Sequence, residues 1–106
     1  MLTQAWIDEW SAETCERYGL SLLSVILRDG DLYLQMMSVY RGLEGQGRGT
    51  NALRALCGLA DEYGYRIVLT AATGRLSAFY ERHGFVPNTG PDRDRYLRSR
   101  MMRLPH

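Results

Sequence analysis

The sequence has no lysine among its 106 residues, and it has only two cysteines, two histidines and three prolines. The lack of lysine excludes the nucleoside triphosphate loop, which needs Gly-Lys-Ser/Thr. Cys15 and Cys57 stand apart without metal-site spacing, so we expect no bound metal and reduced, intracellular thiols. The longest apolar stretch, residues 20–27, is far shorter than the roughly 20 residues of a spanning helix. Because no basic leader precedes an apolar run, we expect a cytoplasmic protein without a signal peptide or membrane contact.

Composition and charge are typical of one small globular domain. The sequence is 45% hydrophobic and 24% charged, which fits a single domain over residues 1–106 with room for one core. Residues 1–40 carry two arginines against six acidic residues, a balance of −4, and residues 41–106 carry eleven against six, a balance of +5. The basic part fits an anionic ligand, such as a phosphorylated cofactor or a nucleic acid, and it also fits a solvated surface.

Apolar periodicity, caps and turn residues predict eight elements. In order, they are a helix over 3–18, strands over 20–28 and 31–40, a helix over 49–63, a strand over 66–72, a helix over 75–83, and strands starting near 85 and over 95–104. The order α-β-β-α-β-α-β-β predicts an α/β layer fold with a mixed sheet. Asp29-Gly30 predicts a two-residue hairpin turn. The nearly continuous apolar content of residues 31–40 predicts a strand buried on both faces.

A glycine-rich loop is the first chemical signal. Residues 41–50 hold four glycines between a predicted strand and a predicted helix. Such a loop lets backbone N–H groups converge, and the helix N-terminus adds about half a positive charge, so the place suits a phosphate or diphosphate. Arg48 and Thr50 would add a charge and a hydroxyl donor. The spacing is not the G-x-G-x-x-G of dinucleotide folds, and a glycine-rich connection without a ligand remains the alternative.

Aromatic residues give the second signal. Tyr80 lies on the short helix that follows the next predicted parallel strand. Since the loop after one strand and the helix after its parallel neighbour meet at the same sheet edge, Tyr80 would face the glycine loop. A core aromatic is the alternative for Tyr80. Trp6 and Trp10 recur on one face of the first helix, and we interpret them as core residues, with an acceptor site as the alternative.

Taken together, the two segments resemble the GNAT superfamily of N-acetyltransferases. The family has a Gln/Arg-x-x-Gly-x-Gly/Ala loop after a strand valine, and Val39, Gly47 and Gly49 stand at its valine and glycine positions. Thr50 follows where the family often has serine. Residues 79–85, Phe-Tyr-Glu-Arg-His-Gly-Phe, resemble the family's aromatic-Tyr-Glu-Arg-x-Gly-Phe segment.

The resemblance covers about residues 31–88 and implies a GNAT-like mixed sheet flanked by helices, with a shortened N-terminal part. Two positions depart from the family pattern. Glu44 stands at the first loop position, where the family has Gln or Arg, and Thr73 stands where the family often has Asn. The shortened N-terminal part normally helps to form the acceptor pocket, so the pocket is open or is completed by a second subunit, which leaves a homodimer as an option.

The resemblance implies an acetyl-CoA-dependent N-acetyltransferase in which a primary amine attacks the thioester directly in a ternary complex. Tyr80 would be the catalytic residue that protonates the departing CoA thiolate. Acetyl-CoA would bind at the splayed end of the strand and in the loop, at Met37, Val39, Glu44, Gly45, Gln46, Gly47, Arg48, Gly49, Thr50 and Thr73. The general base stays open between water, His83 and Glu81.

The sequence contains little that indicates the acceptor, and we expect a small-molecule or peptide amine. Arginines gather near the C-terminus, but no nucleic-acid recognition motif accompanies them, so nucleic acid is not favoured as a partner. Two alternatives remain open. One is a catalytically silent acyl-CoA-binding or interaction module, and the other is an acetyltransferase that acts on aminoacyl-tRNA.

Overall fold

The computed structural model describes residues 2–71, 74–87 and 101–106. Its elements are α1 (Gln4–Tyr18), β1 (Leu20–Arg28), β2 (Asp31–Val39), α2 (Arg48–Tyr63), β3 (Arg66–Leu69), α3 (Gly74–Glu81), β4 (Val86–Pro87) and β5 (Met101–Arg103). The predicted order of helices and strands is confirmed. Most of the strand predicted over 95–104 lies outside the described residues.

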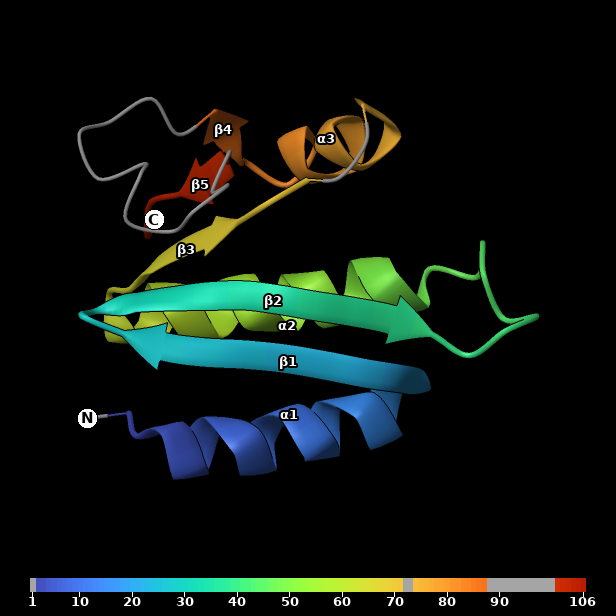
Figure 1. The fold of residues 1–106 in the computed structure, drawn as a ribbon, viewed down its shortest axis with the longest axis horizontal. Coiled ribbons are helices and arrows are strands. Elements are labelled where there is room, and N and C mark those ends of the chain that lie inside the picture. Colours follow the sequence, from blue (N-terminus) through green and yellow to red (C-terminus); the bar gives the residue numbers. More distant parts are fainter. Residues whose placement is uncertain (1, 72–73, 88–100) are drawn as a thin grey trace.

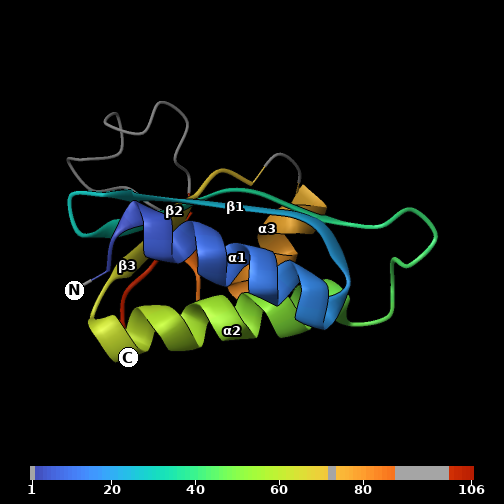
Figure 2. The ribbon, with the colours of Figure 1, turned by 90° about the horizontal axis from the view of Figure 1, so that it is seen from below.

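The described strands form one sheet in the order β1-β2-β3-β5-β4. β2 and β3 are parallel and the other neighbours are antiparallel, which confirms the predicted mixed sheet (Figure 1). α1 and α2 both lie beneath β1 and β2, on the same face of the sheet (Figure 2). The core lies between these two layers, and its fully buried side chains include Ile7, Leu32, Leu53, Leu56, Ile67 and Leu69.

Local sequence signals explain where the first elements begin and end. The Thr3 hydroxyl accepts a hydrogen bond from the Trp6 N–H at 3.1 Å and caps α1, and Gly19 ends this helix with φ at 72°. Asp29 and Gly30 both have positive φ, at 51° and 83°, as a type I′ hairpin turn requires. The predicted two-residue turn is therefore confirmed, with Arg28 and Asp31 paired across it.

The prediction that β2 is buried on both faces is wrong at Gln35 and Met36, which are exposed. Leu34 pairs with Val25 and Met36 pairs with Ser24, so Gln35 is an extra residue in the ladder, a β-bulge. The bulge changes which residues face the core, and no described helix covers the opposite face of β1 and β2. The apolar run of β2 therefore does not indicate two buried faces.

The two tryptophans of α1 differ from the predicted core assignment. Trp6 is 41% exposed and packs edge-on against Tyr63 of α2, with ring centroids 6.2 Å apart. Trp10 is partly buried against the core. The core-facing positions of α1 are instead Ile7, Ser11 and Thr14, so the core prediction is wrong for Trp6 and holds in part for Trp10.

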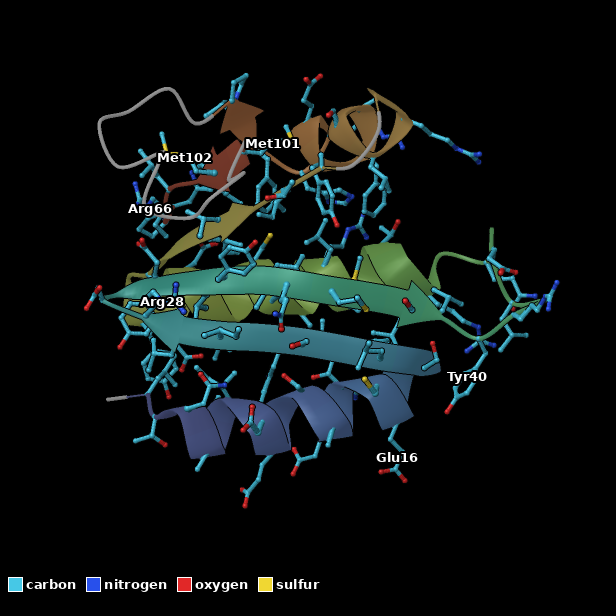
Figure 3. The ribbon with its side chains drawn as sticks, in the orientation of Figure 1. Glu16, Arg28, Tyr40, Arg66, Met101 and Met102 are labelled. Atoms are coloured by element: carbon cyan, nitrogen blue, oxygen red, sulfur yellow. The ribbon has the colours of Figure 1, made fainter. Side chains whose placement is uncertain are left out.

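β2 and β3 form a wedge that opens toward the glycine loop. Their parallel pairing runs from Asp31–Arg66 to Leu34–Leu69, after which β3 ends and β2 continues alone to Val39. An ion pair of 2.6 Å between Asp31 and Arg66 holds the closed end, where Figure 3 shows Arg66. At the wide end lies α3 (Figure 1). Residues 36–39 of β2 thus pair with β1 on one side and with no described strand on the other.

Candidate functional site

The wide end of the wedge holds a hollow of about 390 Å³. It is lined by Val39, Leu43, Gly45, Gly47, Arg48, Gly49, Thr50, Arg75, Leu76, Phe79 and Arg82. The end of β2, the glycine loop, the start of α2 and one face of α3 therefore meet at one place. Six of the eleven lining residues are among those predicted to bind the cofactor, and the five others come from the loop, from α3 and from Arg82 just after it.

The glycine loop presents backbone donors to this hollow. Gly45 and Gly47 have positive φ, at 78° and 76°, and no atom lies where their Cβ would be. Gly47 is the N-cap of α2 and makes no side-chain cap, while its carbonyl accepts from the Asn51 N–H at 3.0 Å. The N–H groups of the first helical residues, Arg48, Gly49 and Thr50, have no partner within the helix. These donors and the positive end of the helix dipole favour an anion here.

Glu44, the departure from the family pattern, binds the loop's own backbone. Its carboxylate accepts a hydrogen bond from the Gly42 N–H at 2.8 Å. The same turn is closed by the Leu43 N–H, which donates to the Tyr40 carbonyl at 2.9 Å, and Gly42 takes the positive φ of 91° that the turn requires. The carboxylate of Glu44 therefore stabilises the turn that leads into the glycine loop.

Arg48 turns its guanidinium toward α1. Nη1 donates to the Tyr18 carbonyl at 3.2 Å, and Nε donates to Oε1 of Gln46 at 3.4 Å. A Cβ at position 19 would overlap this guanidinium, so the contact needs glycine there. Arg48 joins the end of α1 to the glycine loop, and the Gln46 side chain contacts its guanidinium. We predicted that the Arg48 guanidinium contacts the bound anion directly. In the structure this guanidinium instead donates to the Tyr18 carbonyl.

Arg75 on α3 and Arg82, which directly follows its last residue, supply positive charge that sequence reasoning missed. Arg75, Phe79 and Arg82 are separated by four and three residues, which places them on one helical face. All three line the hollow. The signal that could have found them is this helical spacing within a segment already singled out for its tyrosine. Met37, also predicted to bind the cofactor, lies beside Gly49, whose Cβ would be 3.8 Å from the Met37 Cε.

Tyr80 is buried, with 9% of its surface exposed. Its ring centroid lies 5.2 Å from that of Phe79 and 5.5 Å from that of Phe85. Phe79, and not Tyr80, lines the hollow, because adjacent helical residues point about 100° apart. Burial raises the pKa of the Tyr80 phenol, which is therefore protonated throughout the physiological range.

The candidate bases lie at the end of α3. Burial, together with the positive charges of Arg54 and Arg82, lowers the pKa of His83, so its imidazole is neutral at pH 7. The ring of His83 lies 5.2 Å from that of Phe79. Glu81 is exposed. Neither His83 nor Glu81 lines the hollow, and Thr73 lies outside the described residues.

Metal and membrane signals are absent from the described part of the chain. Within residues 2–71, 74–87 and 101–106, no three His, Cys, Asp or Glu side chains come together as metal ligands. None of the described helices has the length and apolar character needed to cross a membrane.

Comparison with known proteins decides the family. Residues 6–85 match the acetyltransferase (GNAT) family. The chain belongs to this family. The resemblance drawn from the glycine loop and from residues 79–85 is therefore confirmed, and the match extends back into α1. No curated protein is similar enough in sequence to this GNAT chain to count as a match.

Solved structures share the GNAT fold with this chain. A mutant of the toxin AtaT bound to the C-terminus of the antitoxin AtaR is similar with a TM-score of 0.52 and 18% identity, over 76% of this chain and 53% of that one. A crystal structure of AtaTR bound with AcCoA is similar with a TM-score of 0.46 and 20% identity, over 74% and 53%. This GNAT chain therefore matches about half the length of those proteins.

Proposed function

We propose that this GNAT chain is an acetyl-CoA-dependent N-acetyltransferase that acts on a primary amine. One observation carries the proposal. The N-terminus of α2, which has no side-chain cap, Arg75 of α3 and Arg82 just after α3 converge on one hollow at the splayed end of β2. A phosphorylated acyl donor with a long thin arm suits a site that combines an anion cradle with an open strand edge.

In this proposal the CoA diphosphate binds at the start of α2. The N–H groups of Arg48, Gly49 and Thr50 donate to it, and Arg75 and Arg82 add charge from the opposite wall. Charged hydrogen bonds of this kind are roughly twice as strong as neutral ones. The pantetheine arm then runs along residues 37–39, whose backbone has no partner on the wedge side among the strands that the structure describes.

The proposed reaction needs no covalent enzyme intermediate. The acceptor nitrogen attacks the thioester carbonyl carbon, and a free N–H of β2 stabilises the oxygen as it becomes negative. The C–S bond breaks, and the Tyr80 phenol, which packs beside the Phe79 ring that lines the hollow, donates its proton to a CoA sulfur bound past that ring. The proton lost by the acceptor nitrogen goes to water, His83 or Glu81. The acetyl group ends as an amide on the acceptor.

The buried environment of Tyr80 determines how much its phenol accelerates the reaction as a general acid. A phenol whose pKa is raised holds its proton firmly, so the group is always ready to donate but is a weak acid. We therefore expect an acceleration at the lower end of the range for acid catalysis, about 100-fold. A thiolate that leaves beside the core would also be poorly solvated, which strengthens the hydrogen bond from a neighbouring phenol.

The remaining parts of the proposal concern partners and location. The acceptor is a small-molecule or peptide amine, the reaction needs no metal, and the protein works in the cytoplasm. The acceptor side is open in the described residues or is completed by a second subunit.

A thiol-release assay with acetyl-CoA and a panel of small and peptide amines tests the proposal. We expect release of CoA that depends on both substrates and that is insensitive to salt. Tight CoA binding without release for any amine would instead indicate a silent acyl-CoA-binding module. Release only with charged tRNA, weakening steeply as salt rises, would indicate an aminoacyl-tRNA acceptor.

A further inference from the structure

A second groove follows the outer edge of β1 and shares no lining residue with the proposed acetyl-CoA site. Its volume is about 660 Å³, and it lies between α1 and the first half of β1. The lining residues are Asp8, Ser11, Ala12, Cys15, Glu16, Gly19, Leu20, Ser21, Leu22, Leu23 and Tyr40. Leu22 is exposed and Leu23 is buried in the core, so side chains from both faces of the strand border the groove. It therefore opens along the strand's edge.

The outer edge of β1 has no strand partner among the described residues, since β1 is the first strand of the sheet. At one end a side chain takes the place of a strand. The Gln4 amide donates to the Val25 carbonyl at 2.9 Å and accepts from the Leu27 N–H at 2.7 Å. Backbone groups of alternate residues point to the same edge, so the N–H and C=O of Leu23 also point outward. No side chain of the described residues bonds them in this way, and Leu23 borders the groove.

The groove has a largely apolar lining that carries two acidic side chains. Asp8 and Glu16 lie on the α1 side, within the part of the sequence whose charge balance is −4. The hydroxyl of Ser11, a residue only 6% exposed, has no hydrogen-bond partner within the described residues. Figure 3 shows Glu16 near the end of α1 and Tyr40 beyond the end of β2, both at the same end of the molecule. The Ser11 hydroxyl faces the core, so the groove offers a docking segment the outward backbone of Leu23 and the negative charge of Asp8 and Glu16.

We propose that the edge of β1 at Ser21–Leu23 is a docking site for an extended, positively charged segment of a partner protein. The segment adds to the sheet as a further strand, pairing with the outward N–H and C=O of Leu23, as in β-augmentation. Its lysine or arginine side chains lie against Asp8 and Glu16. Because this surface does not include the glycine loop or α3, the proposal stands independently of the acetyltransferase activity.

Binding is tested with an eight-residue peptide of alternating lysine and threonine, amidated at its C-terminus. Fluorescence anisotropy should show saturable binding that weakens with salt. A matched peptide of alternating glutamate and threonine should not bind. A lysine–threonine peptide with alternate backbone amides N-methylated should also fail, because it cannot complete the ladder. Equal binding of the glutamate peptide or of the N-methylated peptide would overturn the proposal.

Amide hydrogen exchange locates the docking edge. In the free protein the Leu27 amide, held by Gln4, should exchange slowly and the Leu23 amide quickly. The lysine–threonine peptide should slow exchange at Leu23 at least tenfold and leave Leu27 unchanged. Binding without protection of Leu23 would contradict strand addition at this edge.

A matched pair of α1 variants separates local from general charge effects. Glu16→Gln should weaken peptide binding about two- to fivefold, as expected for a partly exposed ion pair. Glu13→Gln removes the same charge from the same helix outside the groove and should have no effect. Equal effects of the two variants would overturn the proposed contact. Sedimentation of the free protein checks for a dimer. A stable dimer in which the Leu23 amide is already protected from exchange would mean that a second copy of the chain occupies the edge, and this result would also overturn the proposal.

Discussion

The wedge region, made of the end of β2, the glycine loop, the start of α2 and α3, differs from the edge region made of α1 and β1. In the wedge region, each group of the site comes from one short segment. The glycine loop supplies backbone donors, and residues 75–82 supply two arginines. In the edge region, no segment carries a motif, and the groove exists only because α1 lies beside an unpaired strand. Chemistry that one loop encodes is therefore visible in the sequence, whereas a surface made by docking two elements is visible only in the fold.

The largest expected effect is in the wedge region, at Tyr80. Tyr80→Phe removes the phenol proton but keeps the ring packing against Phe79 and Phe85, so kcat should fall about 100-fold with CoA affinity unchanged. Steady-state kinetics and calorimetry measure the two quantities. Because burial raises the pKa of Tyr80, the wild-type rate should not decline through this group until the pH passes ten. Unchanged kcat in Tyr80→Phe would remove the acid role.

A matched tyrosine variant keeps that result interpretable. Tyr63→Phe changes an exposed phenol on α2, outside the hollow, and should leave kcat unchanged. A similar loss of rate in both variants would point to a general effect on folding.

The next largest effect concerns the pair that ties α2 to β5. Both Arg103 Nη groups donate to the Asp61 carboxylate, at 2.8 and 3.1 Å, and the Arg103 side chain is only 8% exposed. Asp61→Ala leaves this guanidinium without its anion, so the free energy of unfolding should fall by about 2 kcal/mol. Urea denaturation measures the change, and a loss below a few tenths of a kcal/mol would contradict the account.

The pH dependence of the same pair has a definite sign. The hydrogen bonds from Arg103 and then from the His106 N–H lower the pKa of Asp61 from 3.8 to about 2. Because the folded-state pKa is the lower one, the stabilisation is fully present above pH 4 and is lost as the pH falls toward 2. Asp61→Ala should not show this acid-dependent loss, so its stability should approach that of the wild type near pH 2.

A pair of glycine variants separates the loop from the helix it begins. Gly47 and Gly64 stand at opposite ends of α2, both with positive φ and with open space at the Cβ. Alanine at either position should cost about 1 kcal/mol of stability. Only Gly47→Ala should also weaken CoA binding, about tenfold, because it disturbs the donors at the start of α2. Equal CoA affinities would show that these donors do not hold the ligand.

The smallest effect is expected in the edge region, at Gln4. Gln4→Ala removes the amide contacts to Val25 and Leu27 from an edge that water can reach, so stability should fall by about 1 kcal/mol or less. The Leu27 amide should exchange faster, while CoA binding stays unchanged. A loss of CoA affinity in Gln4→Ala would mean that the two regions are coupled.

Features that depend on neighbouring residues could be predicted from the sequence, whereas features that depend on how elements pack together could not. Caps, the Asp29-Gly30 turn and apolar periodicity predicted the element order, because each depends on neighbouring residues. The bulge at Gln35 was missed, since it depends on register between two strands. The exposure of Trp6 was missed because it depends on how α1 lies against α2. At the site, the loop glycines were found from spacing, whereas Arg75 and Arg82 needed the position of α3.

Calorimetric titration with CoA and with pantetheine, which lacks the diphosphate and the nucleotide, tests the central claim most directly. The account predicts that CoA binds with measurable heat and that pantetheine binds at least tenfold more weakly, because the start of α2, Arg75 and Arg82 hold the diphosphate. Equal affinity for the two compounds, or no heat with millimolar CoA, would contradict it.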